Sequence, residues 1–596
     1  MSQGDSTQKA LLGVQQSLLG KQWVLSEGND RLGMAFSQRL GIPEIVGRIL
    51  SSRGVQSDKA AENFLEPTLR DSLPDPSHLK DMDKATDRIC QAIETGETMA
   101  VFGDYDVDGA TSSALLKRYF DALGSALRIY IPDRIKEGYG PNVKAFQTLK
   151  SEGASLVITV DCGTTAFDAL EGAQEMGLDV IVMDHHVAES KLPSAVAVVN
   201  PNRLDQDSSV KSVAAVGLCF LLCVSLNRAL RNRGFFKDRS EPDLKQFLDL
   251  VALGTVCDVV SLSGLNRAYV SQGLKVMANR RNTGLSVLGE VAGLSERPEA
   301  YHAGFVLGPR INAGGRVGES SLGGRLLSSD DPHEAKIISL RLNELNKERQ
   351  EIEARVLQEA TEQVESRGKD LPPFLLLSQE GWHPGVIGIV AGRLKDRYHR
   401  PVGVVAIDDE GVGKGSGRSV SGVDLGTAIH GARQSGLLTA GGGHAMAAGF
   451  TVSADALSQF EAFMIERVAQ QMKESDYTPK LMVEGILTPA GASKDFIQVL
   501  SQLAPFGMGN PTPRFVFPNV KVINASIVGN DHIRCLIQGE DGKSLAAIAF
   551  RSVETPLGDV LLSKQRTLLH LAGTLRVDSW QGRETVKLTI EDGANV

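Results

Sequence analysis

The segment that most constrains the fold is an apolar run at residues 98–102, followed by a glycine and three alternating aspartates. Asp104, Asp106 and Asp108 precede a helical pattern of apolar residues that begins near Gly109. Carboxylates two residues apart in extended backbone point the same way, because side chains alternate along a strand. Three close negative charges need a neutralising partner, which predicts a divalent metal site at a strand end. A simple aspartate cap of the helix is the alternative.

Apolar strands alternate with helical patterns over the next hundred residues. Further strands are predicted at 127–131, 155–160, 179–183 and 195–199. This alternation indicates a parallel sheet covered by helices on both faces. Two of these strands also end in polar clusters, Asp161-Cys162-Gly163 and Asp184-His185-His186. Because these are metal-ligand residue types at neighbouring strand ends, we expect one shared site.

The mostly helical stretch that follows contains one isolated carboxylate. Asp258 lies in an otherwise apolar segment, Thr255-Val256-Cys257-Asp258-Val259-Val260. A buried aspartate must be paired, hydrogen-bonded or bound to metal. Asp258 is therefore a further ligand candidate, with a helix cap or buried hydrogen bond as the alternative.

Three glycine-rich segments are candidates for phosphate binding, since glycine lets the backbone approach a ligand closely. The first, at 309–316, is expected to be a loop, and Arg134 could reach the same phosphate. The other two lie in a second lobe, where either could instead be a plain loop. The side chains and glycines concerned are Arg310, Asn312, Arg316, Ser416, Arg418, Ser419, Gly441, Gly442, Gly443 and His444.

The last part of the chain consists of short predicted strands separated by turns. Their number and spacing favour a small barrel, with an OB-fold as the first choice. Phe515, Phe517, Phe550 and Trp580 could stack on bases, although at least half of them are expected in the barrel core.

Composition excludes several functional classes. The net charge of −9 argues against indiscriminate nucleic-acid binding but allows a local basic groove. Six scattered cysteines indicate a reducing, cytoplasmic environment. The sequence contains neither a run of about 18 apolar residues nor an N-terminal secretory signal, so no membrane association is expected.

Taken together, these motifs resemble the DHH superfamily of phosphoesterases, named for the triplet Asp184-His185-His186. Residues 103–109, Asp161-Cys162-Gly163 and Asp258 look like further motifs of that superfamily. Residues 441–450 look like the glycine motif of its associated DHHA1 domain. Residues 381–388 and 505–511 are similar to its bacterial branch that degrades single-stranded DNA from 5′ to 3′.

The resemblance implies an α/β fold in which a parallel-sheet DHH domain and a DHHA1 domain are joined by a long helix. A C-terminal OB-fold-like barrel follows. The expected boundaries are a helical lead-in at 1–95, the DHH domain at 96–330, the connecting helix at 331–370, the DHHA1 domain at 371–475 and the barrel at 476–596.

The resemblance also implies two divalent cations, Mn²⁺ or Mg²⁺. Asp161 would bridge them, Asp106 would bind one, and Asp108, His185 and Asp258 would bind the other. His186 would act on the scissile phosphate or its water, and Asp104 would assist. Phe102 stands where many DHH enzymes have a histidine, so the first ion would be held more weakly.

For the substrate, the resemblance implies that Arg134, Arg310, Ser416 and Arg418 bind a terminal 5′ phosphate and Gly441 to His444 the adjacent backbone. The implied function is a single-strand-specific 5′→3′ DNA exonuclease of repair and recombination, acting as a monomer. Single-stranded DNA, a single-strand-binding protein and a repair helicase are the expected partners. The alternatives are a DHH phosphodiesterase for short oligonucleotides, cyclic dinucleotides or polyphosphate, and a non-catalytic replication scaffold.

Overall fold

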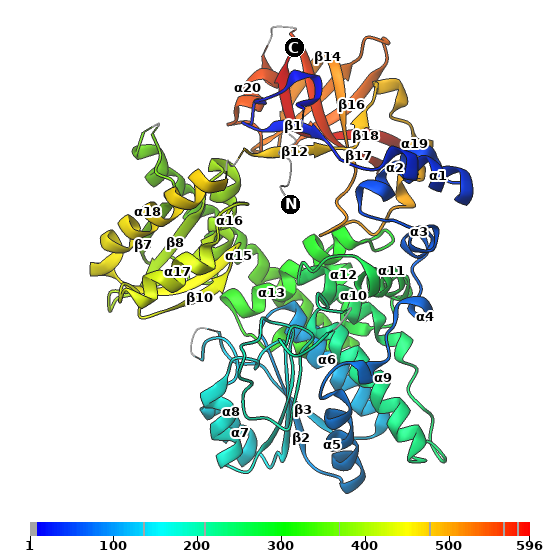
Figure 1. Cartoon of the computed structure of the whole chain (residues 1–596), viewed down its shortest axis with the longest axis vertical. Coiled ribbons are helices and arrows are strands. Elements are labelled where there is room, and N and C mark those ends of the chain that lie inside the picture. The colour runs from blue at the N-terminus through cyan, green and yellow to red at the C-terminus, as the bar shows by residue number, and fades with distance from the viewer. Residues whose placement is uncertain are drawn as a thin grey trace, which may run out of the picture. The chain divides into compact units, whose positions relative to one another are not determined.

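The computed structural model describes residues 9–134, 137–207, 210–368, 370–475, 478–563, 567–580 and 583–596 (Figure 1). The chain forms two compact units. One unit consists of Met1–Ser72, Ser261–Ala268 and Thr478–Val596, and the other of Leu73–Val260 and Tyr269–Tyr477.

The larger unit begins with the predicted parallel sheet, whose strand order is β3-β2-β4-β5-β6. Its strands are β2 (Met99–Gly103), β3 (Leu127–Tyr130), β4 (Leu156–Val160), β5 (Asp179–Met183) and β6 (Ala197–Val199). The order places β2, β4 and β5 side by side, so the three predicted polar clusters follow neighbouring strand ends. This juxtaposition creates the functional site.

Helices cover both faces of the sheet. One face carries an apolar core shared with α7 and α8, and the other contacts α5, α6 and α9. These helices are α5 (Met82–Thr95), α6 (Val107–Leu123), α7 (Val143–Ser151), α8 (Phe167–Glu175) and α9 (Ala215–Asn232). Within the described residues, α9 alone is long and apolar enough to cross a membrane, and most of it is buried inside the unit.

A helical layer completes this domain. It comprises η2 (Pro76–His78), η3 (Leu244–Phe247), α10 (Leu248–Cys257), most of α11 (Gly264–Ala278), α12 (Thr283–Val291), the π-helix η4 (His302–Leu307), α13 (Gly308–Val317) and α14 (Leu322–Ser328). The residues of α11 up to Ala268 belong to the smaller unit. The loop predicted at 309–316 is wrong, because this segment is α13. Its glycines serve close packing: a Cβ on Gly315 would lie 2.6 Å from the carbonyl oxygen of Tyr105.

The long helix α15 (Pro332–Ser366) leads to a second sheet with the order β10-β11-β9-β8-β7. The elements are β7 (Leu375–Glu380), α16 (Ile387–Tyr398), β8 (Val402–Ile407), β9 (Val412–Arg418), α17 (Leu425–Gln434), β10 (Ala440–His444), β11 (Ala447–Ser453), η5 (Ala454–Ala456) and α18 (Leu457–Ser475). Both glycine-rich segments are therefore strands, not loops. The reason is packing, since a Cβ on Gly415 would lie 2.1 Å from the ring of Phe450.

In the smaller unit, a barrel closes through β14-β15-β16-β18-β17, with β17 paired back to β14. Its elements are β12 (Lys480–Val483), β13 (Gly485–Ile486), η6 (Pro489–Gly491), α19 (Lys494–Ser501), β14 (Arg514–Val528), β15 (His532–Gln538), β16 (Ser544–Ala549), α20 (Pro556–Leu562), β17 (Leu568–Trp580) and β18 (Arg583–Asn595). Phe515 and Phe517 belong to its core, as expected for some of the aromatics, whereas Phe550 is exposed. The side chain of Trp580 lies outside the described residues.

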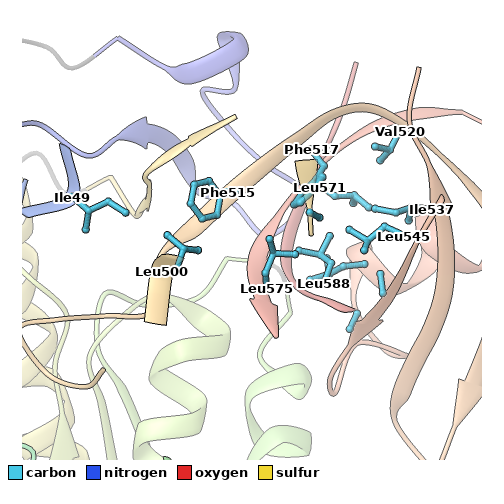
Figure 2. Packing of buried hydrophobic residues seen from close by; sticks show 14 of the residues in the cluster. Ile49, Leu500, Phe515, Phe517, Val520, Ile537, Leu545, Leu571, Leu575 and Leu588 are labelled. Carbon is cyan, nitrogen blue, oxygen red and sulfur yellow. The ribbon is translucent and has the colours of Figure 1, made fainter. Parts of the chain in front are cut away.

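N-terminal elements share the core of this unit. They are η1 (Leu11–Gly13), β1 (Gln22–Leu25), α1 (Asp30–Leu40), α2 (Glu44–Ser52), α3 (Asp58–Leu65) and α4 (Leu69–Ser72). Figure 2 shows Ile49 of α2 beside Leu500 and Phe515. The N-terminal segment is not wholly helical, since β1 pairs in parallel with β12 and the indole of Trp23 donates to Asp592 at 3.0 Å.

Candidate metal centre and phosphate pocket

The first aspartate turn serves both as a helix cap and as part of the site. One oxygen of Asp106 accepts hydrogen bonds from the backbone N–H groups of Asp108 and Gly109, at 2.8 and 3.1 Å. A Cβ on Gly109 would lie 2.3 Å from the carbonyl oxygen of Asp104, so this position requires glycine. The turn thereby brings the three carboxylates to the start of α6.

Asp108 is held by a second helix. Its two carboxylate oxygens accept the backbone N–H groups of Ala215 and Val216, at 2.7 and 2.9 Å, where α9 begins. The first N–H groups of a helix have no partner within it and favour an anion. Burial, followed by the charge of Asp106, nevertheless raises the pKa of Asp108 to about 7.

His185 lies among three carboxylates. Its Nε2 atom is 3.2 Å from Asp161 Oδ1, 3.6 Å from Asp258 Oδ2 and 3.8 Å from Asp108 Oδ2. Asp161 adopts a left-handed φ of 62°, which is rare outside glycine and typical of functional positions. Tyr139, which the sequence analysis missed, donates its hydroxyl to the carbonyl oxygen of Asp161 at 3.1 Å.

All seven residues proposed for metal binding or catalysis meet at this edge of the sheet. Their potential ligand atoms form three groups, each with all atoms within 4.8 Å of one another. The groups are Asp104–Asp106–Asp161, Asp108–His185–Asp258 and Asp161–His185–His186. Asp161 belongs to the first and third groups and His185 to the second and third, so these two side chains link the groups to one another.

The electrostatics of the cluster fit a divalent cation. Asp104 Oδ1 and Asp258 Oδ2 are buried without a hydrogen-bond partner among the described residues. Burial, followed by neighbouring carboxylates, raises the pKa values of Asp104 and Asp161 well above the usual range and that of Asp258 to about 9. Burial also lowers the pKa of His185 to about 4, which keeps the imidazole neutral. Oxygen ligands and a neutral imidazole suit Mn²⁺ or Mg²⁺.

Asp184 orients the histidines and was not assigned a role from the sequence. Its carboxylate accepts from the backbone N–H groups of Thr164 and His185 and lies 2.7 Å from His186 Nδ1. Burial alone would raise the pKa of Asp184, but hydrogen bonds from His186 and Thr164 outweigh it and lower the pKa. Burial would lower the pKa of His186, and Asp184 raises it instead.

Phe102 provides no ligand. Its ring is buried and stacks against Tyr130 at 5.5 Å, with Phe146 at 6.2 Å. Asp104 instead joins Asp106 and Asp161 in the first ligand group, as the sequence analysis expected of an assisting carboxylate.

A cluster of guanidinium groups lies in the same unit. Burial, followed by the charges of Arg134 and Arg349, lowers the pKa of Arg316 to about 10. The pKa of Arg418 is lowered by burial and by Arg134. Arg418 donates to Ser416 Oγ at 3.1 Å, and Arg316 donates to the carbonyl oxygen of Gly385 at 3.0 Å. Several guanidinium groups whose charges lower one another's pKa form a cluster suited to binding a phosphate.

Arg349 was missed because it lies within the regular charge pattern of α15, where nothing in the sequence separates it from solvent-facing arginines. Arg134 lies over the ring of Tyr105, 4.7 Å from its centroid, on the loop after β3. The ring helps to fix the guanidinium through a cation–π contact.

Several predicted substrate residues are not brought to this cluster. Arg310 donates to Asn343 at 3.1 Å and to the carbonyl oxygen of Val306 at 2.7 Å, and Asn312 lies half-buried on α13. The hydroxyl of Ser419 is buried and donates to the carbonyl oxygen of Val423 at 2.8 Å. Gly441, Gly442, Gly443 and His444 form the edge strand β10, in which His444 is paired with Ala447 of β11, itself paired with Arg418 of β9. Their expected contact with the adjacent DNA backbone stays a prediction.

Comparisons with known proteins agree with this architecture. Family models match at residues 98–255 (DHH family, N-terminal domain), 372–471 (DHHA1 domain) and 483–592 (RecJ OB domain). The expected fold class is confirmed: the sheet, the connected second lobe and the barrel define a DHH-family protein with an OB domain.

Two relatives are named single-stranded-DNA-specific exonuclease RecJ. The protein from Bacillus subtilis strain 168 is 34% identical, over 96% of this chain and 71% of its own. The protein from Escherichia coli K12 is 34% identical, over 92% of this chain and 96% of its own. A crystal structure of RecJ from Thermus thermophilus in complex with Mn²⁺ matches with a TM-score of 0.79 and 28% identity, covering 96% of this chain and 79% of that one. The chain belongs to the RecJ family.

Proposed function

We propose that this protein is a divalent-metal-dependent exonuclease specific for single-stranded DNA, which it degrades from the 5′ end. The observation that carries the proposal is the partly buried cluster of Asp104, Asp106, Asp108, Asp161, His185 and Asp258, in which two buried carboxylate oxygens have no hydrogen-bond partner among the described atoms. The names of the relatives and the Mn²⁺ held by the Thermus protein support the same activity.

The residues of the cluster divide the chemistry between them. Two bound cations, Mn²⁺ or Mg²⁺, would lower the pKa of a water and neutralise the oxygens of an in-line displacement at phosphorus. Asp161 would bind both ions from between the two ligand groups. Asp106 would serve one ion, and Asp108, His185 and Asp258 the other. His186, fixed by Asp184, is available to contact the scissile phosphate or orient the water.

The guanidinium cluster would determine the direction in which the strand is degraded. Arg134, Arg316 and Arg418, with the hydroxyl of Ser416, offer several donors to one anion. A terminal phosphate monoester carries more charge than an internal diester and would gain more from this pocket. A bound 5′ phosphate would fix the first linkage at the metals.

The barrel would add sequence-tolerant affinity for the strand, as OB domains do, and this affinity should weaken with salt. We propose that the protein acts as a monomer in the cytoplasm, in DNA repair and recombination. A single-strand-binding protein and a repair helicase would supply and maintain its substrate.

The direct test is digestion of a long single strand labelled at either end, with and without Mn²⁺. We expect Mn²⁺-dependent release of the 5′ label first, and no digestion of the duplex. Faster hydrolysis of a dinucleotide than of the long strand would instead indicate a phosphodiesterase for short oligonucleotides.

The ligand assignment predicts that Asp161→Ala removes Mn²⁺ binding and activity together, because Asp161 would contribute to the binding of both ions. Isothermal titration with Mn²⁺ measures this loss. Asp168→Ala, an exposed carboxylate on α8, is the control and should bind Mn²⁺ normally. Equal Mn²⁺ uptake by the wild type and Asp161→Ala would contradict the assignment.

A further inference from the structure

Two aromatic side chains are stacked on the surface of the larger unit. Tyr301 and Phe305 have ring centroids 5.2 Å apart and an interplanar angle of 25°. Their residues are 61% and 72% exposed. Exposing a large aromatic ring to water forgoes about 2 kcal/mol of burial free energy, so a paired exposure suggests that something covers it.

The element that carries these rings is unusual. Phe305 lies on the π-helix η4, and Tyr301 caps it. Such helices are rare and are frequently found at functional sites. A Cβ on Gly308 would lie 2.5 Å from Cys257 Sγ, which itself donates to the carbonyl oxygen of Ala303 at 3.4 Å.

This element links the two parts of the site. Cys257, which η4 contacts, immediately precedes the candidate ligand Asp258. At its other end η4 continues without a break into α13, which carries Arg316 of the guanidinium cluster. The aromatic pair therefore lies on an element that contacts the residue next to a candidate metal ligand. A DNA strand bound at the metals would lie close to this element.

From this juxtaposition we propose that Tyr301 and Phe305 form a platform on which bases of the bound single strand stack. The inference rests on the proposed function and adds a base-binding subsite to it. Aromatic rings serve single-strand binding without sequence preference, because every base has a π face.

Local charge favours bases over phosphates as the occupant. His302, between the two rings in sequence, lies 3.0 Å from a carboxylate oxygen of Glu296 and accepts the backbone N–H of Glu299. Carboxylates on the preceding turn would repel a phosphodiester but not the neutral face of a base.

Area argues against a protein partner. Two aromatic side chains bury at most about 300–500 Å². A stable protein interface needs about 800 Å² per partner. The platform suits one or two bases.

The test compares strand binding by the full-length wild type and the double variant Tyr301→Ala/Phe305→Ala, in the absence of divalent metal. The probes are a 5′-phosphorylated oligothymidylate and a strand of equal length with abasic sugars. We expect the variant to bind oligothymidylate about tenfold more weakly and the abasic strand as tightly as the wild type does. Tyr301→Phe should keep wild-type affinity, because it keeps the ring.

The control is Ile337→Ala/Leu340→Ala, which removes two exposed apolar side chains from α15 and should change neither affinity. Equal losses on both probes, or on neither, would overturn the proposal. Phe305→Leu removes one ring but keeps an apolar side chain, so it gives the same comparison if the double variant fails to fold. A wild type that does not digest single strands would overturn the proposed function. A wild type that digests them, together with a double variant whose affinities for the two probes keep the wild-type ratio, would overturn only the platform.

Discussion

Asp184 helps to fix the geometry of the site through hydrogen bonds to both histidines. It holds the backbone of His185 and the ring of His186 with one carboxylate. All of its partners donate hydrogen bonds. In Asp184→Asn, the NH2 group that replaces one carboxylate oxygen would therefore face an N–H donor of a partner. A buried donor without an acceptor is costly.

Asp184→Asn should therefore lower kcat for single-strand digestion by about 10–100-fold, the usual cost of losing a partner that orients ligands. KM should change little, because the guanidinium cluster is untouched. Steady-state kinetics at saturating Mn²⁺ measures both quantities, with Asp168→Asn as the control. An unchanged kcat would show that His186 needs no such orientation.

At this scale the sequence predicted which residues meet but not which way every side chain points. Residues after parallel strands must gather at one edge, and for this reason Asp106, Asp161 and His185 were found. Nothing in residue type shows that the hydroxyl of Ser419 turns toward its own loop, or that Arg310 turns toward Asn343. Those directions follow from packing around the helix and turn that carry them.

At the scale of elements, α15 and α16 are joined through a buried carboxylate. Glu353 on α15 is ion-paired with Arg349 on the same helix and with Arg393 on α16, the latter at 2.5 Å. Glu353 and Arg349 are almost fully buried, whereas Arg393 is about a third exposed. Glu353 thus connects Arg349 of the guanidinium cluster with Arg393 of the second lobe.

Glu353→Ala should leave Arg349 buried without its partner, at a cost of about 3 kcal/mol. Amide hydrogen exchange across α15 and α16 should become faster by the factor that corresponds to this loss of stability. Glu351→Ala, at an exposed position two residues away, is the control and should exchange as the wild type does. Unchanged protection in Glu353→Ala would mean that apolar packing alone holds the two helices.

A second ion pair predicts a pH dependence. Arg88 on α5 pairs with Glu97 at 2.7 Å and with Asp179 at the start of β5 at 2.6 Å. Hydrogen bonds from Arg88 and then Ser155 lower the pKa of Glu97 from 4.5 to about 2. Because the folded pKa is depressed, the stabilisation is complete above about pH 4.5 and is lost as the pH falls toward 2.

Glu97→Gln should therefore destabilise the protein more at pH 6 than at pH 3. Urea unfolding midpoints of the wild type and the variant measure the difference at each pH. A difference that stays constant between pH 6 and pH 3 would show that the pair contributes nothing through its charge.

Glycine-rich segments show where sequence interpretation of elements fails. Segments 309–316, 415–419 and 441–444 were candidate phosphate-binding segments, and the first was expected to be a loop. They lie instead in α13, at the end of β9 and in β10. Glycine serves close backbone approach in a packed helix or sheet as well as in a loop. Only the neighbouring elements, which the sequence does not place, decide between these uses.

At the scale of the whole molecule, the compact units do not follow the order of the chain. The parallel sheet and the barrel were predictable because their strands have regular spacing. The partnership of residues up to Ser72 with the barrel was not, since periodicity reveals an apolar face but not what covers it. Arg267 gives an example: it donates to the carbonyl oxygens of Phe64 and Leu503, far apart in sequence.

This division predicts the outcome of truncation. Removing 480–596 alone should give an insoluble protein, because Phe36, Ile49 and Trp23 would lose their core. Removing 1–72 together with 478–596 should leave a soluble protein that binds Mn²⁺ but holds long strands weakly. Titration with Mn²⁺ and strand-binding measurements test this, and loss of Mn²⁺ binding would contradict the division.

The contact between Trp23 and Asp592 spans 569 residues of sequence. A ribosome adding roughly 5–20 residues per second needs about half a minute to two minutes to cover that interval. Through that time the first segment emerges without the strands that bury it, while the whole catalytic sheet is already available to fold. We therefore expect that the catalytic domain can fold during synthesis before the unit built from the two ends of the chain is complete.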